Sequence, residues 1–232
     1  MTSRIFPPLP PVAAVIFDMD GLALDTEPAY ACAWKQAASS FGVALSDEFC
    51  ASLMGKTAED VQIELQRAMG DGFDLTRFYP LAEKHWREHI RNFRISRMPG
   101  LVRLVALLRE RRIPYALATN SRRIYALECL HFAEAEDLFS LIVCRDDVAK
   151  GKPAPDLVLE AARRLGVTPD RCWVLEDSEA GLMAAVQARA VPVLVNRGPE
   201  AERLKHLASA HLDTLEQVAS LLDGQDFATA TA

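Results

Sequence analysis

The chain has 232 residues, 50% of them hydrophobic and 25% charged, with a formal net charge of -6. This is the composition of an ordinary globular protein with one large domain or a core and a smaller insertion, and it holds no basic patch of the kind that nucleic-acid binding requires. No stretch approaches the ~20 apolar residues of a membrane span, the N-terminus lacks the apolar region of a signal peptide, and the five cysteines form no C-x-x-C pair, so we expect a soluble, cytoplasmic protein with free thiols.

The first predicted strand ends in a group of polar residues. Residues 1–11 contain four prolines and are expected to be irregular. An apolar, partly β-branched run at 12–17 predicts a buried strand, which stops at Asp18, Asp20 and Gly21. Carboxylates at the end of a buried strand are costly unless they are paired or bind a metal. This stretch therefore indicates a functional site.

A purely helical block follows the first strand. Between residues 27 and 96 apolar residues recur at helical spacing and no strand pattern occurs. We expect helices from Thr26 to Gly42, from Ser46, from Thr57 to Met69, and over 74–94.

Strands and helices alternate after the break at Met98-Pro99-Gly100. Strands are predicted at 115–118, 141–143, 172–175 and 191–195, and helices at 102–111, 122–132, 153–165, 180–188 and, more weakly, 215–222. This alternation predicts an α/β fold with a Rossmann-like, doubly wound parallel sheet covered by helices on both faces. Residues 225–232 are expected to form a disordered tail.

Three predicted strands end in polar residues: Asp18 and Asp20, Thr119 and Asn120, and Glu176 and Asp177. The carboxyl ends of parallel strands share one edge of a sheet, so we expect these groups to converge. Gathered carboxylates need a counter-ion, and oxygen ligands with a substrate phosphate suit Mg²⁺.

A lysine follows the second of these groups. Lys152 precedes Pro153, which we expect in the first turn of the helix over 153–165. A lysine there can balance the carboxylates and hold a phosphoryl oxygen as a point charge.

Together these residues resemble the four signatures of the haloacid dehalogenase superfamily. The signatures are D-x-D-G at Asp18 to Gly21, a threonine ending a strand at Thr119, the lysine of G-K-P-x-P-D at Lys152, and an acidic pair at Glu176-Asp177. The chain is similar to the β-phosphoglucomutase and phosphoglycolate phosphatase branch. The resemblance implies a core domain over 12–26 and 97–224, and identifies 27–96 as an inserted α-helical cap domain.

The resemblance also implies the roles of the site residues. Asp18 would be the nucleophile and Asp20 the general acid and base. Thr119 and Lys152 would stabilise the transferred phosphoryl group. Gly21, the Asn120 amide and Lys56 complete the expected phosphate- and substrate-binding set, with Lys56 in a specificity loop over Gly55 to Thr57. Mg²⁺ would be held by Asp18, the Asp20 carbonyl and Asp177, with Glu176 as a further ligand or a supporting partner.

Two alternatives to a phosphatase stay open. A phosphosugar mutase of the β-phosphoglucomutase type is known for a histidine where this chain has Tyr30, and for an arginine where it has Ala58, and both differences favour hydrolysis of the aspartyl-phosphate. A binding protein without chemistry on the same fold is the second alternative. The expected partner is a small phosphorylated metabolite, with the protein a monomer or a weak homodimer.

Overall fold

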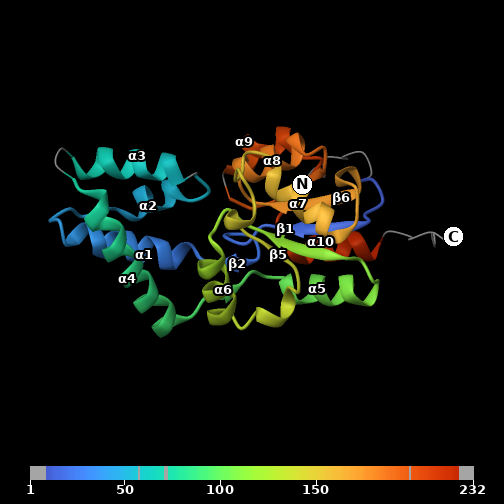
Figure 1. The fold of residues 1–232 in the computed structure, drawn as a ribbon, viewed down its shortest axis with the longest axis horizontal. Helices are drawn as coiled ribbons and strands as arrows, with labels where there is room; N and C mark the ends of the chain where they lie inside the picture. Colours follow the sequence, from blue (N-terminus) through green and yellow to red (C-terminus); the bar gives the residue numbers. More distant parts are fainter. Residues whose placement is uncertain (1–8, 57, 71–72, 199, 225–232) are drawn as a thin grey trace.

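The computed structural model describes residues 9–56, 58–70, 73–198 and 200–224. Within them, a six-stranded sheet has the order β5-β4-β1-β6-β7-β8, and every neighbouring pair is parallel (Figure 1). The strands are β1 Ala14–Phe17, β4 Tyr115–Ala118, β5 Ile142–Val143, β6 Cys172–Glu176, β7 Val191–Val195 and β8 Ala210–Leu212. The predicted parallel α/β fold is confirmed.

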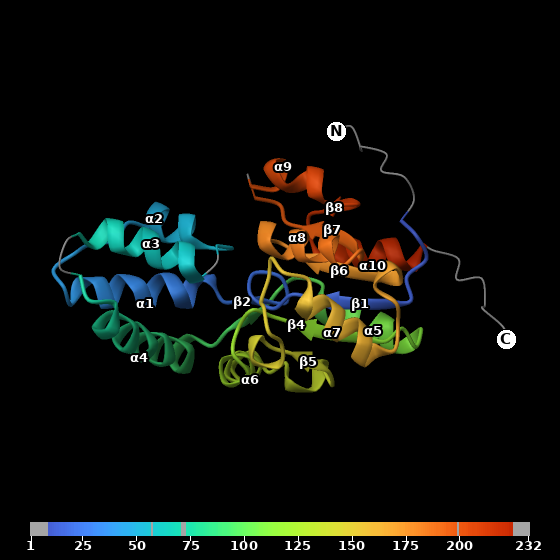
Figure 2. The same ribbon diagram turned by 45° about the horizontal axis from the view of Figure 1, so that its top comes forward.

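Helices cover both faces of this sheet (Figure 2). One face packs on α5 Leu101–Glu110, α6 Arg123–Phe132 and α10 Leu215–Asp223, and the other on α7 Asp156–Leu165 and α8 Glu179–Gln187. In β1, Val15 and Phe17 belong to the first core and Ala14 and Ile16 to the second. Because both faces are buried, the strand is continuously apolar rather than alternating.

Residues 27–93 form a helical block beside the sheet. It comprises α1 Glu27–Ser39, α2 Asp47–Leu53, α3 Ala58–Met69 and α4 Leu75–Phe93, and no strand occurs in its described part. Trp34, Leu65 and Phe78 help to form a hydrophobic core of its own. Thr57, Asp71, Gly72 and the predicted tail at 225–232 lie outside the described residues.

Two short strands join this block to the sheet-bearing part. β2 Leu24–Asp25 and β3 Ser96–Arg97 pair antiparallel, so the chain leaves and returns at the same place. The C-terminal half of α4 also packs, through Trp86 and Ile90, on the hydrophobic core that lies between the sheet and α5, α6 and α10. None of the described helices is long and apolar enough to cross a membrane.

Several features differ from the sequence-based expectation. The helix expected from Pro153 begins at Asp156, because Ala154 precedes Pro155 and a residue before proline is disfavoured in the α conformation. Strands β2, β3 and β8 and the short helix α9 Glu200–Leu204 were not predicted, and Ser96 of β3 lies within the block expected to be purely helical. Short 3₁₀ helices complete the described elements, at Glu136–Leu138, Arg145–Asp147, Pro169–Arg171 and Lys205–Leu207.

Candidate active site

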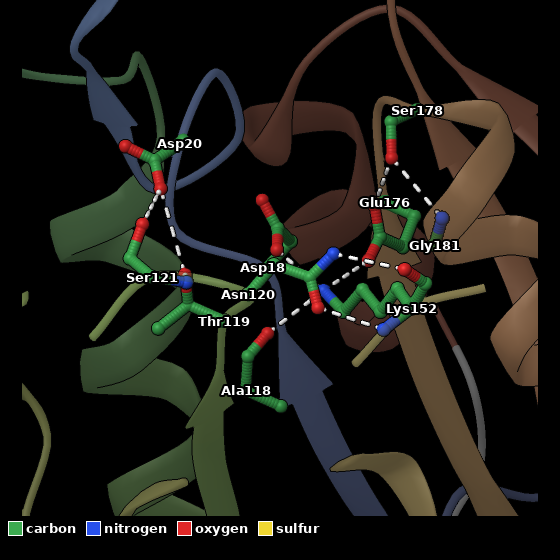
Figure 3. Close-up of polar contacts among 10 residues, drawn as sticks. All are labelled: Asp18, Asp20, Ala118, Thr119, Asn120, Ser121, Lys152, Glu176, Ser178 and Gly181. Atoms are coloured by element: carbon green, nitrogen blue, oxygen red, sulfur yellow. Dashed lines mark hydrogen bonds and ion pairs between the residues drawn. The ribbon is translucent and has the colours of Figure 1, made fainter. Parts of the chain in front are cut away.

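The central strand β1 lies between β4 and β6, and this order brings the polar strand ends together (Figure 3). Asp18 follows β1, Thr119 follows β4, and Glu176 is the last residue of β6. The loop before α7 adds Lys152, whose side chain reaches between the strand ends.

Lys152 is the buried cation of this site. Its ammonium group contacts Asp18 Oδ1 and donates hydrogen bonds to Glu176 Oε1 at 2.5 Å and to the Ala118 carbonyl at 2.8 Å. Burial by itself would lower the pKa of Lys152, but the charges of Asp18 and Glu176 outweigh burial and hold this pKa above its ordinary value. The lysine therefore remains charged and compensates the two carboxylates.

Asn120 holds the backbone of Lys152 in place. Its Nδ2 donates to the Lys152 carbonyl at 3.0 Å, and its Oδ1 accepts from the Lys152 N–H at 2.7 Å. Both polar atoms of the side-chain amide are thus hydrogen bonded to Lys152. The main-chain N–H of Asn120 is a further donor that a phosphoryl oxygen can use.

Three carboxylates form a cluster that fits a hard cation. One ligand oxygen each from Asp18, Glu176 and Asp177 lie within 4.8 Å of one another. Asp177 Oδ1 is buried and has no hydrogen-bond partner among the described residues. Burial, and then the charges of Asp18 and Glu176, raise the pKa of Asp177 well above its ordinary value. An unpartnered buried carboxylate oxygen beside two others is the donor set expected of a Mg²⁺ site.

Glu176 differs from the other two carboxylates because both of its oxygens have partners. Oε1 accepts from Lys152, and Oε2 accepts from Ser178 Oγ at 3.1 Å. A Cβ at Gly181 would overlap this carboxylate, so glycine is required there. Burial raises the pKa of Glu176, against the lowering effect of Lys152. These contacts favour a supporting partner over a direct metal ligand.

Asp20 turns away from Asp18 and into a group of hydroxyl donors (Figure 3). Its carboxylate accepts from Thr26 Oγ1 at 2.9 Å, Ser121 Oγ at 2.9 Å, Tyr125 OH at 3.2 Å and, more weakly, Thr119 Oγ1 at 3.5 Å. Burial and the charge of Asp18 raise the pKa of Asp20 to about 6, although these hydrogen bonds lower it.

Most of the residues that donate hydroxyl hydrogen bonds to Asp20 were not identified from the sequence. Thr26, at the expected start of the first helix, is its N-cap residue, but its side chain makes no capping hydrogen bond and binds Asp20 instead. Ser121 and Tyr125 were not identified. The sequence signal was a hydroxyl two residues after Thr119 and an aromatic hydroxyl one helical turn later. Tyr30 packs against Tyr125 with ring centroids 5.8 Å apart.

Gly21 lies directly against the Asp177 carboxylate. Its φ is +82°, and a Cβ there would overlap Asp177 Oδ2. Its N–H donates to the Leu24 carbonyl at 2.9 Å. The absence of a side chain at Gly21 therefore makes room for the Asp177 carboxylate, and its expected role in phosphate binding stays a prediction.

Lys56 lies at a pocket next to the carboxylate cluster. The pocket has a volume of about 720 Å³ and is lined by Lys56 and Gly55 from the helical block and by Asp177 and Ser178 from the sheet-bearing part. Thr57, the third residue of the expected specificity loop, is outside the described residues.

Comparison with known proteins places this arrangement in a family. Residues 15–195 match the sequence model of the haloacid dehalogenase-like hydrolases. The chain belongs to this family. The expected resemblance is confirmed, and the protein is an enzyme of the haloacid dehalogenase-like hydrolases rather than a non-catalytic binding protein.

Individual members of the family are similar over most of the chain. A phosphorylated carbohydrates phosphatase of Thermotoga maritima is 33% identical over 75% of this chain and 81% of its own length. β-Phosphoglucomutase of Bacillus subtilis is 34% identical over 80% of this chain and 84% of its own. The crystal structure of a family hydrolase from Deinococcus radiodurans, with bound phosphate and sodium, is 27% identical, covers 91% of this chain and 98% of its own, and has a TM-score of 0.73.

In this haloacid dehalogenase-like hydrolase the site combines three chemical capacities. Asp18 offers a carboxylate that contacts Lys152, Asp177 offers an oxygen for a cation, and the pKa of Asp20 is raised to about 6 by burial and the charge of Asp18. A nucleophile, a cation site and a group that exchanges protons near neutral pH are the requirements for displacement at phosphorus.

Proposed function

We propose that the protein is a Mg²⁺-dependent phosphatase that hydrolyses a small organic phosphomonoester through an aspartyl-phosphate on Asp18. The observation that carries this proposal is the pairing of Asp18 with buried Lys152, next to an Asp177 oxygen that has no hydrogen-bond partner among the described residues. Family relatives that include a phosphorylated carbohydrates phosphatase support the same reaction class.

Asp18, Asp177 and the Asp20 carbonyl are the groups that would hold Mg²⁺, with Glu176 supporting them through Lys152 and Ser178. When bound, the ion would neutralise phosphate charge and favour the approach of an anionic ester to the carboxylates. Lys152 supplies the remaining positive charge, and the Thr119 hydroxyl with the Asn120 N–H can donate to phosphoryl oxygens.

The reaction proceeds in two displacements. A carboxylate oxygen of Asp18 attacks phosphorus, the bond from phosphorus to the ester oxygen breaks, and Asp20 gives its proton to the leaving oxygen. Asp20 then takes a proton from water as the water oxygen attacks phosphorus, which releases inorganic phosphate and restores Asp18.

Asp20 must turn for this chemistry. Here its carboxylate faces Thr26, Ser121 and Tyr125 rather than the space next to Asp18. We propose that Asp20 leaves these partners when substrate binds.

The proposal includes the domain organisation, the cellular location and the oligomeric state of the protein. Residues 12–26 and 97–224 would form the core domain, and 27–96 a cap that covers the site from the β2–β3 connection. The substrate would be a small phosphorylated metabolite in the cytoplasm, and the protein a monomer or a weak homodimer.

A phosphosugar mutase is the second candidate, because β-phosphoglucomutase of Bacillus subtilis is a relative at 34% identity. Tyr30, where that enzyme type is known for a histidine, favours hydrolysis. Incubation with β-glucose 1-phosphate separates the two: release of inorganic phosphate supports the phosphatase, and formation of glucose 6-phosphate without phosphate release supports the mutase.

The direct test is hydrolysis of p-nitrophenyl phosphate with and without Mg²⁺. We expect activity that EDTA removes, that added Mg²⁺ restores, and that Asp18→Asn abolishes. Asp137→Asn, an exposed site on a 3₁₀ helix, is the control and should keep full activity. Activity that survives Asp18→Asn would refute the assignment of the nucleophile.

A further inference from the structure

The pocket beside Asp177 is large enough to receive an organic leaving group. Its volume of about 720 Å³ falls within the range of small-molecule sites. One wall comes from α2, 54–56 and α3 of the helical block, and the other from the start of α8, from Asn196 and Gly198, and from α9. The two walls approach closely, since a Cβ at Gly55 would lie 3.7 Å from Ser178 Cβ. In Figure 1 the connection between α2 and α3 faces α8 and α9.

The position of this pocket relates it to the proposed chemistry. Asp177 both lines the pocket and belongs to the carboxylate cluster with Asp18. A phosphoryl group held at Asp18 therefore has the pocket as neighbouring space for the rest of its ester.

The described lining of the pocket is strongly acidic. It contains two basic side chains, Lys56 and Arg203, against the carboxylates of Glu27, Asp60, Glu64, Asp177, Glu179 and Glu200. Arg203 is already engaged, because it donates to Glu179 Oε2 at 2.6 Å and to Glu200 Oε2 at 2.9 Å. Glu64 is paired with Arg67, whose Nη1 donates to Glu64 Oε1 at 3.1 Å. With Glu64 so paired and Asp177 assigned to a metal, the acids Glu27, Asp60, Glu179 and Glu200 still outnumber the two bases.

Glu27 is an acid of the pocket lining at the start of the helical block. It is the first residue of α1 and is exposed to solvent, and no basic partner for it occurs among the described residues. It lines the pocket together with Asp177, which also belongs to the carboxylate cluster.

We infer that this pocket selects phosphomonoesters whose leaving group carries hydrogen-bond donors, either hydroxyl or ammonium, and no second anionic group. The inference rests on the proposed phosphatase function. Ionised carboxylates accept hydrogen bonds and cannot donate them, so donor groups satisfy the pocket. A carboxylate or second phosphate on the leaving group meets charges of its own sign, and such repulsion lowers affinity and the rate of encounter.

The test compares substrates that share a carbon skeleton. Glycerol 3-phosphate and 3-phosphoglycerate differ by a hydroxymethyl group in place of a carboxylate, as do glucitol 6-phosphate and 6-phosphogluconate. We expect kcat/KM for the alcohol to exceed that for the acid by about tenfold or more at low salt. A factor of this size corresponds to repulsion between the acid's carboxylate and one or two carboxylates of the pocket when salt does not screen them. The kcat/KM for fructose 1-phosphate should likewise exceed that for fructose 1,6-bisphosphate.

Two further measurements separate charge from shape. The ratio of kcat/KM for the alcohol to kcat/KM for the acid should fall when ionic strength rises from about 0.05 to 0.5 M, because salt screens the repulsion. Glu27→Gln should lower the ratio several-fold by improving kcat/KM for the acid, whereas Glu110→Gln, on exposed α5 surface outside the pocket, should leave it unchanged.

The outcomes distinguish this inference from the proposed function. A ratio near or below one at low salt, or a ratio that neither salt nor Glu27→Gln changes, overturns the inference. If p-nitrophenyl phosphate is hydrolysed in an Asp18-dependent way in the same preparation, the proposed phosphatase stands. If no phosphomonoester is hydrolysed at all, the proposed function fails and the inference fails with it.

Discussion

The side-chain amide of Asn120 is hydrogen bonded to both main-chain groups of Lys152, accepting from its N–H at 2.7 Å and donating to its carbonyl at 3.0 Å. The two residues lie in different connections, one after β4 and the other before α7. This pairing holds the loop in which Lys152 lies, so that the lysine side chain can extend between the carboxylates at the ends of β1 and β6.

Asn120→Ala should therefore impair catalysis through Lys152. Loss of both hydrogen bonds should cost about 1 to 3 kcal/mol of stability, and misplacement of the ammonium should lower kcat about 10- to 100-fold. Denaturant unfolding and steady-state kinetics measure the two effects. Asn92→Ala, exposed on α4, is the matched control; equal kinetics in both variants would contradict the positioning role.

Lys152→Met should destabilise the protein in a pH-dependent way. Removing one partner of a buried ion pair costs about 3 to 5 kcal/mol when the remaining charges stay ionised. Burial raises the pKa of Glu176, and loss of Lys152, which lowers that pKa, should raise it further. A carboxyl with a raised folded-state pKa binds protons more tightly than in the unfolded chain. Glu176 thus stabilises the fold when the pH is below its ordinary pKa of about 4.3. This contribution is lost as the pH rises through the pKa that Glu176 has in the folded protein.

Urea unfolding at about pH 5 and pH 8 measures this effect. The difference in stability between wild type and Lys152→Met should grow with pH, while Lys150→Met, at an exposed position two residues earlier, should show no such trend. A difference that is constant across this range would mean that the carboxylates do not depend on Lys152 for compensation.

Gly21→Ala should damage the metal site specifically. Gly21 and Gly42 both have positive φ, +82° and +77°, so alanine at either position should cost about 1 to 2 kcal/mol of backbone strain. At Gly21 the added Cβ would also overlap Asp177 Oδ2, whereas nothing lies within 4 Å of a Cβ at Gly42. We expect similar losses of thermal stability from the backbone alone, but weaker Mg²⁺ binding, measured by calorimetry, only for Gly21→Ala. Unchanged Mg²⁺ binding would remove Asp177 from the proposed ligands.

Thiol labelling should find one rapidly reacting cysteine in the native protein. Cys50, Cys129, Cys144 and Cys172 are buried, and burial raises the pKa of each thiol, to about 11 for Cys144 and Cys172. Only Cys32 is partly exposed. Ellman's reagent at about pH 8 should titrate one thiol quickly and all five after denaturation, and Cys32→Ser should abolish the fast phase. A second fast thiol would show that part of the buried core opens readily.

The sequence patterns that succeeded are local ones. The strand β1 and the alternation after Gly100 follow from apolar runs and helical spacing, and the helical block follows from the same spacing between 27 and 93. The patterns failed where an element is too short to show a period. Strand β8 has three residues with His211 in the middle, and α9 has five residues.

By itself, the sequence determined the fold class, the family and the set of polar residues at the strand ends, because each depends on residues close together in the chain. Only the tertiary structure decided what these residues touch. The contact between Asn120 and Lys152 spans 32 positions and that between Tyr125 and Asp20 spans 105. Such contacts depend on which strands are neighbours in the sheet and on the direction of each side chain. Neither can be predicted from the local periodicity of the sequence. For that reason the sequence could identify Asp20 but not the hydroxyl groups around it.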